Sequence, residues 1–215
     1  MKRVYLPKIV TTIMVALSFT ANLSALEVNI KKDLPFVEVE FEGKIMKIQR
    51  VQDTQKKLNN SYAKTSRPCP PFCVQALEPI EGIVAISELD VLDFIQKKLS
   101  NNRGALVDAR MPKWHQNGTI PGAVNIPFSI LSADEDNPYV DQIFKLFGAT
   151  KSKKGWNFSD AMQLLLFDNG PWCQQAVSGM RNLIKHGYPK DKISYYRGGM
   201  QFWQLLGLST IVPKQ

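Results

Sequence analysis

"LLLFDNGPWCQQAVSGMRN", residues 164–182, joins a run of apolar residues to a loop with Gly and Pro and then to an amphipathic segment. The apolar residues 163–167 predict a buried strand, because short apolar runs bounded by turn residues are typical of sheet interiors. Residues 173–186 predict a helix that is closed by Gly187 and Pro189. A strand that leads through a tight loop into a helix is typical of an anion-binding loop, because a helix N-terminus presents unpaired N–H groups.

Short apolar segments alternate with helical patterns on both sides of this stretch. Asp168 stands where the strand 163–167 ends. Such alternation predicts the α/β class, with a mainly parallel sheet that helices cover on both faces. Functional sites in these sheets lie at the carboxyl ends of the strands, which is where Asp168 is expected. Further strands are expected at 105–108, 123–128 and 193–196, and further helices at 87–100 and 139–147.

The residues before this pattern predict a small extension. Residues 36–50 alternate apolar and polar side chains around Gly43, which predicts a β-hairpin. Residues 51–81 are polar and then rich in proline, so we expect a linker without long regular elements. The expected organisation is therefore an extension and linker over 26–81 and the main domain over 82–215.

The first 25 residues predict a signal peptide. A basic start is followed by a short apolar run over 9–19 and by small residues at 23–25, where cleavage is expected. An uncleaved anchor is disfavoured, because three hydroxyl residues dilute the run. The protein is expected in the periplasm or outside the cell, with no stable membrane span once the signal is removed.

Charge and histidine content argue against two classes of function. The net charge is +8, and removing the three cations of the signal segment leaves +5. The basic residues are scattered, apart from the cluster at 151–154 in an expected loop, so no nucleic-acid partner is expected. With only His115 and His186 beside the cysteines, no metal site is expected, and no cofactor is expected either.

Two further stretches carry a family resemblance. "LVDARMPKWHQNGTIPGAVNIPF" (106–128) and "YYRGGMQFWQLLGL" (195–208) resemble the two signatures of the rhodanese family. The resemblance covers roughly residues 82–210, although Thr119 stands where the family usually has His. "SRPCPPFC" and "NGPWC" also resemble a subset of exported rhodanese-like proteins, whose loop reads Cys-Asn-Gly-Pro-Trp-Cys.

The resemblance implies sulfur transfer through a cysteine at the end of the central strand, which becomes a persulfide while loop N–H groups hold the anionic sulfur. In this sequence that position is Asp168. A carboxylate oxygen cannot carry a sulfane sulfur, and an ionised Asp168 is expected to accept those N–H groups itself. The hypothesis is a rhodanese-like protein of sulfur metabolism that is non-catalytic or weakly active, with a small sulfur anion or a partner protein thiol as its ligand. Asn169, Gly170, Trp172 and Arg110 are the expected binding residues.

Cys173 leaves an alternative open. A cysteine at a helix N-terminus has a stabilised thiolate, so Cys173 is a candidate persulfide carrier of an active sulfurtransferase. The helical period instead places it on the apolar face with Ala176, Met180 and Leu183, which favours a buried residue. A cysteine-based phosphatase is excluded, because its arginine position is occupied by Gly179.

Cys69 and Cys73 support a third hypothesis. Three cysteines are an odd number, so at least one is free, modified or paired with another molecule. Cys69 and Cys73 are expected to form a disulfide that ties down the linker, locally or with Cys173, and the alternative is a thiol-disulfide redox pair.

Overall fold

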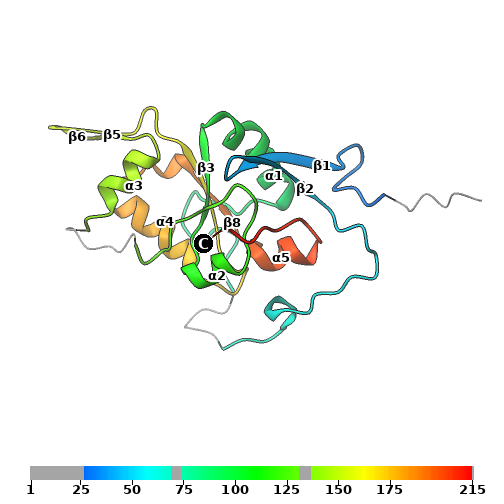
Figure 1. Ribbon diagram of the computed structural model, residues 1–215. Coiled ribbons are helices and arrows are strands. Elements are labelled where there is room, and N and C mark those ends of the chain that lie inside the picture. The colour runs from blue at the N-terminus through cyan, green and yellow to red at the C-terminus, as the bar shows by residue number, and fades with distance from the viewer. Residues whose placement is uncertain (1–26, 69–73, 131–136, 215) are drawn as a thin grey trace, which may run out of the picture.

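The computed structural model describes residues 27–68, 74–130 and 137–214 (Figure 1). The predicted signal peptide lies outside the described residues, and so do Cys69 and Cys73. In the part of the chain that is described, no helix is long and apolar enough to cross a membrane.

A four-stranded parallel sheet forms the centre of the molecule. Its order is β4-β3-β7-β8, with β3 at Gly104–Asp108, β4 at Val124–Asn125, β7 at Gln163–Phe167 and β8 at Ile193–Tyr196. The predicted mainly parallel α/β sheet is confirmed. The strand predicted at 123–128 is shorter than expected, since Pro127 has no N–H to donate to the ladder.

Alternating side chains of β7 pack into two hydrophobic cores on opposite faces of the sheet. Leu164 and Leu166 pack in one core with α3 (Val140–Leu146) and α4 (Gln175–Lys185). Leu165 and Phe167 pack in the other with α1 (Glu88–Lys97) and α5 (Gly199–Leu205). Both faces are therefore covered, as the buried apolar run 164–167 of β7 requires (Figure 1).

The N-terminal hairpin forms part of the second core. It consists of β1 (Phe36–Phe41) and β2 (Lys44–Gln49), and the turn residues Glu42 and Gly43 both have positive φ, at 49° and 73°. This is the turn chemistry that matches the twist of a two-residue hairpin. Val37, Val39 and Ile48 are buried with α1 and α5, so the predicted appendage is an integral layer of the fold.

The predicted helix at 87–100 forms with its expected cap. Ser87 and Asp90 make a capping box at the start of α1, which ends at Lys97, and the 3-10 turn η2 (Leu99–Asn101) follows. The described part of the linker contains one short 3-10 turn, η1 (Ser61–Ala63).

The cluster at 151–154 is only partly in a loop. Lys153 and Lys154 form the turn of a hairpin, but Lys151 and Ser152 belong to its first strand, where a loop was expected. The hairpin consists of β5 (Thr150–Ser152) and β6 (Gly155–Asn157) and projects from the body (Figure 1). Trp156 anchors the hairpin, because its ring lies edge-on to Phe144 with centroids 5.2 Å apart. Three short elements were also not predicted: α2 (Pro112–Gln116), η3 (Lys190–Lys192) and α5.

Candidate functional site

The loop 168–173 follows β7 at the carboxyl edge of the sheet. Asp168 is completely buried at its start. One carboxylate oxygen accepts the N–H of Gly170 at 3.1 Å, and the other accepts the N–H of Ala176, in the first turn of α4, at 2.8 Å. The carboxylate therefore occupies donors that the loop and the helix N-terminus would otherwise offer to an anion.

The ionisation of Asp168 is set by burial without a cation. Burial raises the pKa of Asp168 to about 6, against the hydrogen bonds from Ala176 and Gly170, which favour the charged form. The carboxyl is thus mostly ionised at pH 7 and becomes neutral in mildly acidic solution.

Cys173 lies in the same loop and is also buried, as its place on the apolar face predicted. The prediction that a helix begins at Cys173 was wrong: α4 begins at Gln175, and the Cys173 N–H donates to the carbonyl of Gly170 at 2.8 Å in a turn. Its Sγ lies 3.6 Å from Nδ2 of Asn169. Burial, together with the charge of Asp168, raises the pKa of the Cys173 thiol to about 12. At neutral pH the sulfur is a protonated thiol and a poor nucleophile.

A buried polar network lies against the other side of the loop. The Tyr62 hydroxyl donates to Oδ1 of Asn169 at 2.8 Å and accepts from Nη1 of Arg110 at 3.0 Å. Arg110 forms a two-point ion pair with Asp108, at 2.8 and 2.6 Å, and also donates to the carbonyl of Gly118. The loop is thereby joined to the end of β3.

The position of Arg110 limits its predicted binding role. It lies beside the loop, as expected, but its side chain is only 1% exposed and its guanidinium makes four hydrogen bonds to three residues of the protein. In this structure Arg110 holds Asp108 and Tyr62 in place, and its guanidinium is not exposed to bind an anion.

Asp108 is stabilised as an anion. Burial opposes its ionisation, but hydrogen bonds from Arg110, His115 and Thr119 hold its pKa below the ordinary value. The Thr119 hydroxyl donates to the Asp108 carboxylate at 2.8 Å. Thr119, which stands where the resemblance led us to expect His, thus has a clear structural role.

The linker covers the loop on its outer side. Trp172 donates through Nε1 to the side chain of Gln201 at 2.6 Å, and the Arg67 guanidinium lies 4.0 Å from the centroid of its ring. The Gln75 N–H donates to the carbonyl of Pro171 at 2.7 Å. The contacts from Tyr62, Arg67 and Gln75 were missed in the sequence, where only an aromatic residue within a polar stretch marks them.

The Gly-Gly signature at 198–199 lets α5 approach the loop. Gly199 has a φ of 53°, and a Cβ at this position would overlap the carbonyl oxygen of Asp168. The first N–H groups of α5 donate to the loop: Met200 to the Asp168 carbonyl and Gln201 to the Asn169 carbonyl, both at 3.0 Å. The loop backbone is therefore fixed from α4, α5 and the linker together.

The chain is similar to several proteins of known structure. Among solved structures, the chain is similar to a human single-domain sulfurtransferase, with 24% identity over 56% of this chain and 95% of that chain and a TM-score of 0.39. It is also similar to a thiosulfate sulfurtransferase from Pseudomonas aeruginosa, with 16% identity over 65% of this chain and 22% of that chain and a TM-score of 0.46.

A third similar structure is a protein of unknown function from Rhodopseudomonas palustris, described as a possible tyrosine phosphatase. It is 16% identical over 67% of this chain and all of that chain, with a TM-score of 0.45. No curated protein matches. The rhodanese-like domain family model, however, matches residues 92–206, just over half of the chain. This protein therefore belongs to the rhodanese-like domain family.

Proposed function

We propose that this protein acts in sulfur metabolism as a non-catalytic or weakly active rhodanese-like module, which binds a small sulfur anion or a partner protein thiol. The observation that carries the proposal is the Asp168 carboxylate, which accepts the N–H groups of Gly170 and Ala176 inside the loop. The residues that the family resemblance assigns to catalysis thus surround an acid, not a thiol.

The chemistry of sulfur transfer explains why an acid silences the loop. A thiolate attacks the sulfane sulfur of thiosulfate, forms a new S–S bond and releases sulfite, and the persulfide then passes its outer sulfur to an acceptor. Asp168 offers only oxygen, which cannot hold that intermediate, and its negative charge repels an anionic donor. We therefore expect anion binding to the loop to strengthen as the pH falls through 6, because Asp168 becomes neutral below that pH.

The proposal includes export. It rests on the sequence of residues 1–25 alone, which has the basic start, apolar run and small residues of a signal peptide. On this reading the protein works in the periplasm or outside the cell.

The catalytic alternative uses Cys173 as the persulfide carrier. Burial and the raised thiol pKa of about 12 argue against it. A redox role for Cys69 and Cys73 is the remaining alternative, and it would fail if thiol titration showed both to be permanently oxidised and resistant to mild reductant.

The deciding experiment is thiosulfate-to-cyanide sulfur transfer by the unaltered protein, Asp168→Cys and Cys173→Ala. We expect the unaltered protein to be inactive or weak and Asp168→Cys to be at least about tenfold more active, because a thiol then sits among the loop donors. Robust activity of the unaltered protein that is lost in Cys173→Ala would overturn the proposal and make Cys173 the nucleophile. Mass spectrometry would then show an added sulfur of about 32 Da on the Cys173 peptide.

A further inference from the structure

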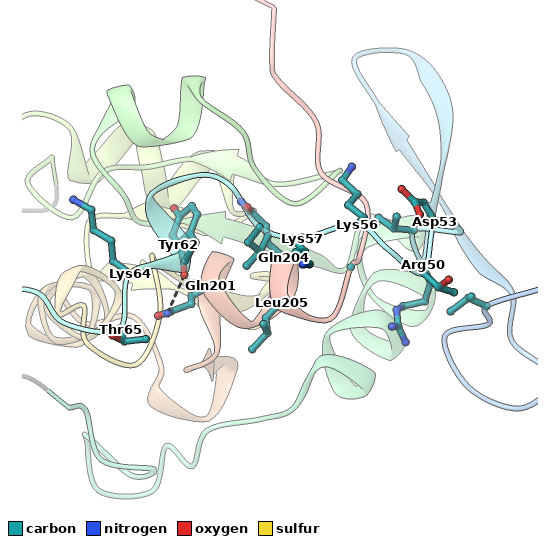
Figure 2. A pocket seen from close by; sticks show the side chains of 16 residues that line it. Arg50, Asp53, Lys56, Lys57, Tyr62, Lys64, Thr65, Gln201, Gln204 and Leu205 are labelled. Atoms are coloured by element: carbon teal, nitrogen blue, oxygen red, sulfur yellow. Dashed lines mark hydrogen bonds between the residues drawn. The ribbon is translucent and has the colours of Figure 1, made fainter.

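A cleft of about 690 Å³ lies between the linker and α5, outside the loop 168–173 (Figure 2). One wall is made by linker residues between 50 and 65, and the other by residues 201–207. A volume of this size is typical of sites for small molecules. We call it the α5 cleft.

The middle of the α5 cleft combines apolar side chains with a cation. Leu205 and Lys57 lie in its central part (Figure 2), and Val51, Leu58 and Tyr62 also line it. Leu205 is 66% exposed, which is unusual for a leucine that borders a concave surface. A ligand with an apolar body would cover this side chain and gain the hydrophobic free energy of burial.

Cations stand at both ends of the cleft. Lys64 lies at one end and Lys56 and Arg50 at the other, with Leu205 between them (Figure 2). No carboxylate of the described residues lies within ion-pair distance of any of these three cations. The lining contains one acid, Asp53, whose carboxylate accepts the N–H of Gln55 at 2.9 Å.

Arg50 adds a second sign of a missing partner. Its Nε is buried and has no hydrogen-bond partner among the described residues. Buried donors in folded proteins are almost always satisfied, and an exception calls for a water or a ligand.

We propose that the α5 cleft binds an elongated organic dianion, with an apolar body on Leu205 and an acidic group toward each end. The opposed cations favour two separated charges over one, and the apolar surface of Leu205 and of the aliphatic stem of Lys57 favours an organic body over a compact inorganic anion such as sulfate. This inference does not depend on the proposed function of the loop, because it rests on other residues.

The cleft is also joined to the loop. Nε2 of Gln201, on the cleft wall, donates to the carbonyl of Tyr62 at 3.3 Å, and its Oε1 accepts from Trp172 at 2.6 Å. A ligand in the cleft therefore lies against residues that hold Trp172. Binding should change the fluorescence of that indole.

The probe is decanedioate, titrated into the full-length protein at low ionic strength by calorimetry. We expect saturable binding of one molecule, at least about tenfold tighter than binding of decanoate, which lacks one charge, or of butanedioate, which lacks the long apolar body. Tryptophan emission should change over the same titration, and most of that change should be absent in Trp172→Phe. Absence of saturable heat, or equal affinity for all three acids, overturns the proposal.

Matched variants locate the site. The pair Lys56→Gln/Lys64→Gln and the single change Leu205→Ser should each weaken decanedioate binding about tenfold. The pair Lys153→Gln/Lys154→Gln makes the same change of charge on the β5–β6 turn, and Leu146→Ser alters a leucine on α3 that is 60% exposed. Both controls should retain affinity within about twofold. An equal loss in the cleft variants and the controls would mean that only net charge or general apolar surface attracts the acid, and would overturn the site.

Discussion

Two buried aspartates follow neighbouring strands of the same sheet, and they are held in opposite ways. Asp108, at the end of β3, has a two-point ion pair with Arg110 and a lowered pKa. Asp168, after β7, has two backbone donors and the Cys173 thiol but no cation, and its pKa is raised by burial to about 6. The first anion is satisfied by its own cation, whereas the second uses donors that would serve any anion. The difference supports the proposal that the loop after β7 binds an anion and that the end of β3 supports it.

The largest expected effect is a difference in the free energy of unfolding that is lost when each aspartate is replaced by Asn. Asp108→Asn leaves the buried Arg110 guanidinium without its countercharge, and should lower the free energy of unfolding by about 3–5 kcal/mol. Asp168→Asn removes no ion pair and should cost only about 1–2 kcal/mol. Urea unfolding at pH 7 measures both values. Equal losses would show that the ion pair of Asp108 contributes no more to stability than the hydrogen bonds of Asp168, and would contradict the contrast drawn between the two carboxylates.

The next effect is a pH dependence that Asp168 alone produces. A carboxyl whose pKa rises from about 4 in the unfolded chain to about 6 in the folded protein stabilises the fold most at low pH, and this contribution is lost as the pH rises toward 6. The stability of the unaltered protein relative to Asp168→Asn should therefore fall by about 2–3 kcal/mol between pH 4 and pH 7.5.

Urea unfolding at several pH values tests this, with Asp168→Asn as the reference that cannot titrate. A relative stability that rises with pH would mean that the loop donors outweigh burial and that the pKa of Asp168 is lowered instead of raised.

A smaller effect tests whether the linker connects the two acids. Tyr62→Phe removes the hydroxyl that bonds both Asn169 and Arg110, and should cost about 1–2 kcal/mol in urea unfolding. Tyr139→Phe is the matched control, since Tyr139 is 53% exposed and should change stability by less than about 0.5 kcal/mol. If the two variants were equally stable, the network through Tyr62 would contribute nothing to the loop.

The sequence predicted the parts of this site that follow one another along the chain. β7, the loop and Asp168 were visible because a strand, a turn and a helix each carry a local pattern. The contacts of Tyr62 and Gln75 were not visible, because residues distant in sequence meet the loop only after the linker folds over it. The satisfied state of Arg110 was hidden for a similar reason, since its partners Tyr62 and Gly118 are brought together by packing and not by periodicity.

The smallest expected effect is a pH dependence at Asp108 whose direction is opposite to that at Asp168. Thr119→Val keeps the shape of the buried side chain and removes one hydrogen bond to the Asp108 carboxylate, at a cost of about 1 kcal/mol at pH 7. Because the pKa of Asp108 is lowered in the fold, this contribution is present above the unfolded value of about 4 and is lost as the pH falls below it. The unaltered protein should therefore lose its advantage over Thr119→Val on acidification, while it gains relative to Asp168→Asn. Urea unfolding of the three proteins from pH 7 to pH 3 measures both slopes, and slopes of the same sign would contradict the assignment of one acid to an ion pair and the other to an anion-binding loop.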